Sequence, residues 1–199
     1  MTAALNPALA PPPVARRPRV LMVATGFVTA GVAMFFAALF GIYLLERSTA
    51  LADGAKWLPE GVTIPLTQPN MLLLTLIMAS VCMQWALNAI RDDSRTYAYL
   101  ALGITLLLGF AFLNQASYLY GVMQYKIEAS TNAVLVYAIT GGHIVMLVVA
   151  MVFVALMAIR ALGGQFSSTQ SDGIAAATMF WHANTAVFFL IWLIIYVTK

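Results

Sequence analysis

The stretch VLMVATGFVTAGVAMFFAALFGIYLL, residues 20–45, contains no Asp, Glu, Lys or Arg and decides the fold class. A helix needs about 20 consecutive apolar residues to cross a hydrocarbon core about 30 Å thick, and this stretch exceeds that length. Arginines precede it, and Glu46 and Arg47 follow it, so charged residues mark both of its ends. We interpret residues 20–45 as a membrane-spanning helix.

The rest of the chain repeats this pattern of apolar blocks separated by short polar segments. The further blocks cover residues 69–90, 97–122, 132–159 and 174–197. Only 9% of the 199 residues are charged, against roughly 25% in a soluble domain, so a water-exposed surface cannot be built from this composition. We therefore predict an all-α protein, an integral membrane bundle of five transmembrane helices.

The domain organisation follows from the same pattern. Residues 20–199 are predicted to form a single transmembrane domain. Residues 1–19, with Pro11, Pro12 and Pro13, lack hydrophobic periodicity, so we predict a flexible cytoplasmic tail there.

Basic residues at the ends of the blocks predict the orientation. With the N-terminus inside, the cytoplasmic side carries Arg16, Arg17, Arg19, Arg91, Arg95 and Arg160, and the outer side carries Arg47, Lys56, Lys126 and Lys199. The positive-inside rule favours this arrangement, chiefly through the arginines before the first block. An odd number of spans then places the C-terminus outside. Because the basic residues form no patch, we expect no nucleic-acid partner.

The five blocks contain no Asp, Glu, Lys or Arg. A charge at the bilayer centre costs at least about 2.5 kcal/mol, and ion and proton carriers retain such residues for their function. This composition disfavours an autonomous pump, a voltage sensor or a small transporter. We expect no catalytic residue and no metal site in this chain.

Two histidines, His143 and His182, lie within different blocks and allow two interpretations. They could ligate a haem, which would make the chain a di-histidine membrane anchor of another redox complex. The histidines could instead form interhelical hydrogen bonds, and we favour this interpretation. The two helices start from opposite membrane faces, so the histidines lie at different depths unless both reach the middle of the membrane. The candidates for helix contacts or lipid sites are His182, Trp181, His143, Gln115, Arg160 and Asn184.

Two further patterns concern the helix surfaces. Ala33, Ala37 and Gly41 recur at intervals of four and allow close helix approach, so the first span is a candidate partner-contact helix. Aromatic residues near block ends predict an interfacial belt: Tyr43, Tyr97, Tyr99, Tyr118, Tyr120, Tyr137, Trp181 and Tyr196.

Several short motifs occur in a fixed order along the whole chain. They are MFFAALFGIY at residues 34–43, the Pro65 to Asn70 entry to the second block, GFAFLNQASY at 109–118, TGGH at 140–143 and FWH at 180–182. In order and spacing the chain resembles subunit III of the haem-copper respiratory oxidases, in the short five-span form of several bacterial enzymes. It departs from that family at Val32, Met146 and Thr185, where the family has Glu, His and Asp, and in lacking the acidic residue of the 109–118 motif.

The resemblance implies an accessory non-metal subunit of a cytochrome c or quinol oxidase, a complex of aerobic respiratory electron transport. It implies oxidase subunits I and II as partners, which would carry the haem and copper, and bound phospholipid. A larger respiratory supercomplex is a further candidate partner, and the bacterial inner membrane is the implied location. Because Val32 replaces the buried Glu, the implied role is stabilisation and lipid holding rather than proton supply.

Overall fold

The computed structural model describes residues 19–57, 62, 65–123, 125 and 130–198. The predicted tail, apart from Arg19, lies outside these residues, as does Pro59 of the first long connection. The helices are α1 (Val20–Ala52), α2 (Thr67–Arg91), α3 (Arg95–Met123), α4 (Thr131–Leu162) and α5 (Asp172–Ile191), and α5 continues into the π-helical segment η3 (Trp192–Val197). Each of the five spans is long and apolar enough to cross a membrane, which confirms the predicted all-α architecture.

The helices extend further than the apolar blocks that predicted them. Helix α1, for example, continues to Ala52, beyond Glu46 and Arg47. Hydrophobicity marks the part of a helix that lies in hydrocarbon, whereas the backbone hydrogen-bond ladder can continue into the aqueous boundary. The blocks therefore located the spans correctly and underestimated the helix lengths.

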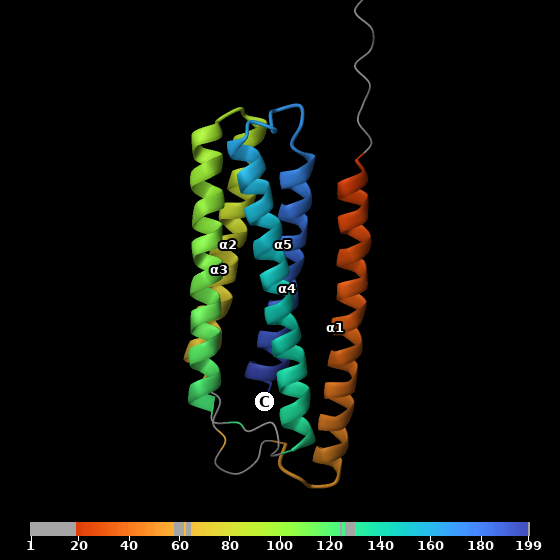
Figure 1. Cartoon of the computed structure of the whole chain (residues 1–199). Coiled ribbons are helices and arrows are strands. Elements are labelled where there is room, and N and C mark those ends of the chain that lie inside the picture. Colours follow the sequence, from red (N-terminus) through yellow and green to blue (C-terminus); the bar gives the residue numbers. More distant parts are fainter. Residues whose placement is uncertain (1–18, 58–61, 63–64, 124, 126–129, 199) are drawn as a thin grey trace, which may run out of the picture.

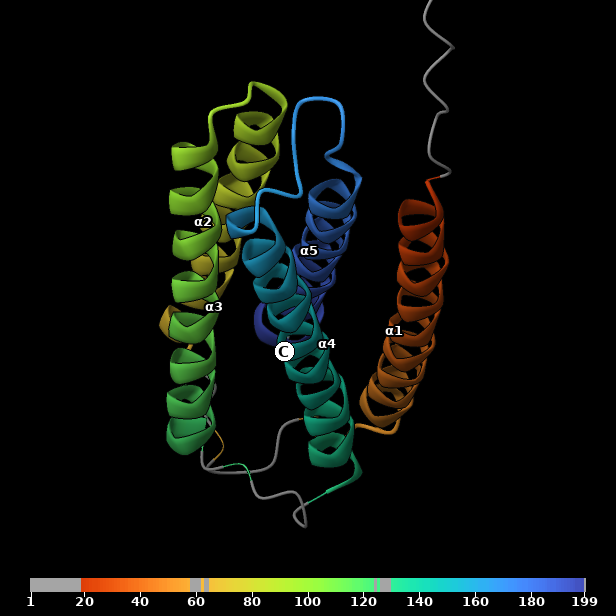
Figure 2. The ribbon, with the colours of Figure 1, turned by 45° about the horizontal axis from the view of Figure 1, so that its top comes forward.

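Helix α5 is the centre of the bundle, because it packs against α1, α2 and α4. Helices α2 and α3 form a tightly packed antiparallel pair on one side, and α1 stands on the other side (Figures 1 and 2). Successive helices alternate in direction, so α1 begins at one end of the bundle and the C-terminus lies at the other (Figure 1). Which end faces the cytoplasm stays a prediction.

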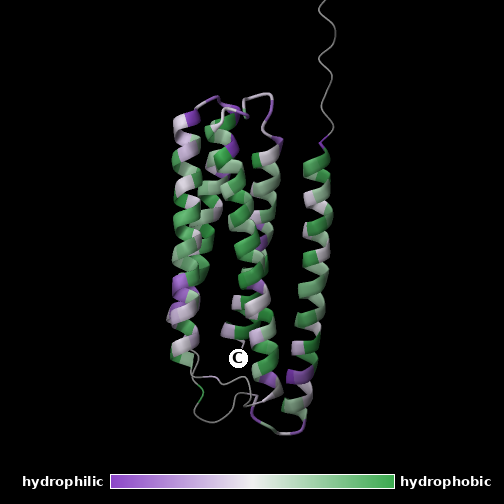
Figure 3. Cartoon of the chain, viewed as in Figure 1, coloured by the Kyte–Doolittle hydropathy of each residue, from purple (hydrophilic) through white to green (hydrophobic). Residues whose placement is uncertain are grey.

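Hydrophobic residues predominate along all five helices (Figure 3), and many large ones are exposed on the outside of the bundle. On α1, Phe27 is 77% exposed and Met34 is 74% exposed, and the buried residues of this helix are Thr25, Phe36, Phe40 and Tyr43. A soluble protein would not leave such a surface open to water. Helix α1 therefore faces lipid or another apolar protein along most of its length.

Polar contacts fasten both ends of α1 to the rest of the bundle. At its start, Arg19 lies 3.7 Å from the carboxylate of Asp172. Near its other end, the indole nitrogen of Trp57, in the connection after α1, donates to the Tyr43 hydroxyl at 2.9 Å, and the Trp57 carbonyl accepts from Asn132 of α4. Arg47 donates to the backbone carbonyl of Thr198, just beyond η3. These contacts position α1 although few of its apolar side chains are buried.

Gly173, at the start of α5, is packed too closely for any side chain. A Cβ atom there would lie 2.8 Å from the sulfur of Met157 and 2.9 Å from the ring of Phe166. A Cβ at Gly109 would lie 2.9 Å from the sulfur of Met151, which ends a flexible side chain. The space around Gly103 is open.

We predict that Gly173→Ala destabilises the bundle by about 1–3 kcal/mol, because the buried Phe166 ring must shift to make room for the new Cβ. Gly109→Ala should cost less, since Met151 can change rotamer. Gly103→Ala is the control and should be neutral or stabilising, because alanine favours the helix. Unfolding midpoints in mixed micelles measure all three, and equal midpoints for Gly173→Ala and Gly103→Ala would contradict the packing argument.

Candidate functional site

Polar side chains inside the bundle form hydrogen bonds that join α5 to its neighbouring helices. His182 of α5 points to α2, where its Nδ1 accepts from the Ser80 hydroxyl. Its Nε2 lies 3.2 Å from the Gln84 side-chain oxygen, an acceptor, so Nε2 carries the proton of a neutral imidazole. Gln84 donates in turn to Asn88 at 3.1 Å. Both ring nitrogens of His182 are therefore used in joining α2 to α5.

His143 joins α4 to α5 from another side. It is 1% exposed, and its Nε2 lies 3.1 Å from the backbone carbonyl oxygen of Asn184. Its ring packs against those of Phe112 and Phe188, with centroid distances of 5.7 and 5.1 Å, and these two rings also contact each other at 5.0 Å. This imidazole is a buried interhelical link with aromatic walls.

The two histidines lie at nearly the same depth in the bundle, but their rings point to different helices. His143 contacts the backbone of Asn184, two residues after His182, which corresponds to about 3 Å along the helix axis. The His182 ring, however, turns to α2 and is held there at both nitrogens. The geometry therefore favours the hydrogen-bonding interpretation over a shared haem.

Gln115 links α2 and α3 through a long hydrogen bond. Its side-chain nitrogen lies 3.4 Å from the Thr75 hydroxyl, which itself donates to the carbonyl of Met71 at 2.8 Å. Gln115 thus contacts a different pair of helices from the two histidines.

Trp181 and Asn184 are fully buried parts of the α5 core. Within the described part of the chain, the Trp181 indole nitrogen and both side-chain amide atoms of Asn184 have no hydrogen-bond partner. Asn184 contributes to helix contacts through its backbone carbonyl rather than its amide group.

Arg160 lies outside this interior network, at the exposed end of α4. Its Nε donates to Gln165 at 2.8 Å, and its guanidinium lies 5.6 Å from the centre of the Phe166 ring. In the same end region, the backbone N–H of Ser168 donates to Asp93 at 2.8 Å, and the hydrogen bonds from Ser168 lower the pKa of this carboxyl. Arg160 therefore organises the connection between α4 and α5 at the bundle end.

An apolar groove runs between α1 and α5 and has a volume of about 250 Å³. Ala33 and Ala37 line it from α1, and Met146 lines it from α4. The remaining lining residues are Thr29, Val32, Phe36, Phe40, Ala183, Ala186, Val187 and Leu190. Gly41 is exposed and does not line the groove. The small residues of α1 thus border an opening and are not covered by another described helix.

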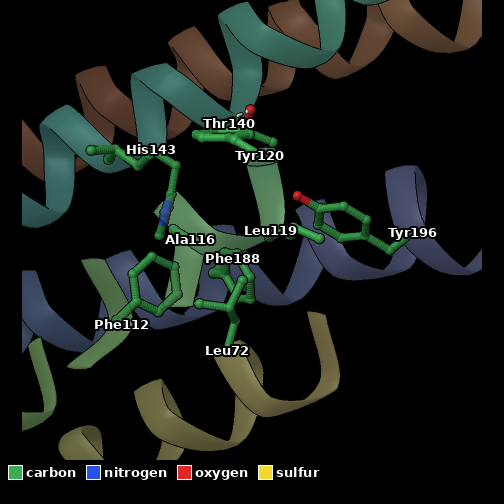
Figure 4. A pocket seen from close by; sticks show the side chains of 10 residues that line it. Leu72, Phe112, Ala116, Leu119, Tyr120, Thr140, His143, Phe188 and Tyr196 are labelled. Carbon is green, nitrogen blue, oxygen red and sulfur yellow. Dashed lines mark hydrogen bonds between the residues drawn. The ribbon is translucent and has the colours of Figure 1, made fainter. Parts of the chain in front are cut away.

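A second, smaller cavity lies inside the bundle, and the sequence analysis did not predict it (Figure 4). Tyr120, Thr140, His143 and Tyr196 contribute the polar part of its wall. Tyr196 was predicted to belong to the interfacial belt, but it is only 2% exposed and points inward. Tyr43 is likewise buried, at 1% exposure, whereas Tyr118 is 61% exposed as a belt residue would be. Position near a span end does not reveal which way a tyrosine points.

Comparison with known proteins identifies the family of this fold. Residues 20–199 match the family model for cytochrome c oxidase subunit III. Similar proteins include the cytochrome c oxidase subunit 3 of Strongylocentrotus purpuratus, 26% identical over 172 residues that cover 85% of this chain and 66% of that protein. The subunit 3 of Carassius auratus is 27% identical over 189 residues, covering 94% of this chain and 70% of that protein.

The chain therefore spans about two thirds of the length of these relatives. The family match includes all five spanning helices, and with them the histidines of α4 and α5. The motifs that carried the sequence resemblance lie in these same helices. This chain belongs to the cytochrome c oxidase subunit III family.

Proposed function

We propose that this multi-pass membrane protein is an accessory, non-metal subunit of a haem-copper terminal oxidase. The observation that carries the proposal is the family match across all five helices. The interior polar groups support it, because both histidines are engaged in joining helices. In this function the partner subunits I and II carry the haem and copper, reduce oxygen with electrons from cytochrome c or quinol, and receive support from this chain.

The proposal extends to location and orientation. The resemblance to the short five-span form implies the bacterial inner membrane, with the N-terminus in the cytoplasm. The arginines at the starting end of α1 support this orientation through the positive-inside rule. The same location allows membership of a larger respiratory supercomplex.

Lipid holding is the second part of the proposal, and the groove beside α1 is its place. The groove lies within membrane-spanning helices and has almost entirely apolar walls. An acyl chain is thin and apolar, and it suits these walls. We therefore assign Ala33 and Ala37 to lipid contact rather than to direct helix contact.

Exposed parts of the chain offer further contacts for lipid and partners. Arg160, at the end of α4, can pair with a phosphate head group through the guanidinium nitrogens that Gln165 does not engage. The outward face of α1, with Phe27 and Met34, offers an apolar surface to subunit I or to the lipid around it. Gly41 lies on this helix in open space and permits close approach there.

The first prediction concerns the complex itself. When the tagged chain is purified from its native membrane in a mild detergent, haem-copper subunits I and II should accompany it with oxygen-consuming activity. Mass spectrometry and optical spectra of the preparation measure this. A chain that purifies alone, or with an unrelated complex, would contradict the proposed function and leave the five-helix fold unaffected.

The second prediction concerns the lipid. Ala37→Leu should reduce the phospholipid that co-purifies with the chain, because the larger side chain fills the groove. Ala38→Leu is the matched control, since Ala38 is exposed on the same helix and does not line the groove. Quantitative lipid mass spectrometry compares the two variants, and equal lipid content would refute the groove as the lipid site.

The third prediction concerns His182. His182→Ala removes a hydrogen-bond partner from both Ser80 and Gln84, and should destabilise the bundle by about 1–3 kcal/mol and weaken assembly of the complex. Asn114→Ala is the control, because Asn114 is exposed on α3. Unfolding midpoints and the yield of assembled complex measure the effect. If the two variants behave alike, His182 does not support the bundle.

A further inference from the structure

The small interior cavity lies among α2, α3, α4, α5 and η3 (Figure 4). It leaves about 10 Å³ for the centre of a water-sized sphere, which is about the room that one water molecule needs. Leu72, Phe112 and Phe188 give it apolar walls, and no charged side chain among the described residues lines it. The cavity therefore has room for one uncharged molecule of the size of water and for nothing larger.

Tyr196 supplies the free donor of this cavity. Its side chain is 2% exposed, and its hydroxyl is directed into the cavity (Figure 4). Among the described residues this hydroxyl has no hydrogen-bond partner. A buried hydroxyl without a hydrogen-bond partner is unfavourable in apolar surroundings. The Tyr196 hydroxyl therefore needs an acceptor inside the cavity.

The π-helical geometry of η3 is what directs Tyr196 inward. The N–H of Thr198 donates to the carbonyl of Leu193, five residues earlier, at 3.1 Å. The wider turn lets the adjacent residues Ile195 and Tyr196 both face the bundle interior. Such turns occur often at functional sites, because they redirect a side chain at a cost to the helix.

His143 supplies an acceptor on the opposite side. Its Nε2 contacts a backbone carbonyl, which can only accept, so Nε2 carries the proton. In the neutral ring Nδ1 then holds a lone pair, and no described residue donates to it.

Tyr120 supplies a second acceptor. Its hydroxyl donates to Thr140 at 2.8 Å, and Thr140 donates onward to the carbonyl of Val136 at 2.7 Å. The proton of each hydroxyl is thus used within the protein, and the Tyr120 oxygen keeps a free lone pair. The cavity wall therefore presents one free donor and two free acceptors.

We propose that this cavity is a binding site for one water molecule. The water accepts a hydrogen bond from the Tyr196 hydroxyl and donates to His143 Nδ1 and to the Tyr120 oxygen. Three partners are the usual number for a buried water, and this arrangement satisfies each free group once. It joins the C-terminal turn to α3 and α4, and it depends on the fold rather than on the proposed oxidase function.

Tyr196→Phe tests the proposal through the sign of its effect. If a water bridges these groups, removal of the donor should shift the unfolding equilibrium of the full chain roughly three- to tenfold toward the unfolded state. If the cavity is dry, the same change removes an unpaired buried hydroxyl and should leave the folded fraction unchanged or raise it, which would overturn the proposal. Tyr118→Phe, on the exposed surface of α3, is the matched control.

A second readout locates the water directly. Density maps of the purified protein, at a resolution that shows ordered waters, should contain a peak within hydrogen-bond distance of Tyr196 Oη and His143 Nδ1. The peak should be lost in Tyr196→Phe. An empty cavity in the unchanged protein, or a peak that persists in the variant, would overturn the assignment.

Discussion

The structure depends on one constraint: the hydrocarbon core of a bilayer offers no bulk water to pair with polar groups. Backbone groups meet this constraint in the helices, since an unpaired backbone group in hydrocarbon costs several kcal/mol. Side chains must meet it in another way. His182 pairs with Ser80 and Gln84, and His143 pairs with the backbone of Asn184. Because these hydrogen bonds join α5 to α2 and to α4, they hold α5 between those two helices.

This pairing also limits the chemistry available to the chain. A histidine whose two nitrogens are hydrogen-bonded, as in His182, is a link between helices and not an open ligand. The membrane interior of this protein therefore uses polar groups mainly for specificity of helix packing. The proposed role beside catalytic partners agrees with such an interior.

Helix α1 shows how the same constraint works at the edge of the bundle. Polar contacts at its two ends, through Arg19, Arg47 and the Trp57 carbonyl, hold it near α4 and α5. Between them the helix is largely exposed and borders the apolar groove. In a membrane this exposure is not unfavourable, because lipid chains can contact the apolar surface. A loosely packed edge helix is therefore stable there and leaves room for a lipid chain.

The sequence by itself determined the number of spans, their helical nature and the family, because apolar length and motif order are one-dimensional properties. For His143 and His182 it left two interpretations, haem ligation and interhelical hydrogen bonding, and named no partners. Only the tertiary structure decided these partners, the inward direction of Tyr43 and Tyr196, and the open groove beside Ala33 and Ala37. The physical reason is that every face of a membrane helix is apolar, so hydrophobic periodicity does not distinguish the side that meets lipid from the side that meets protein.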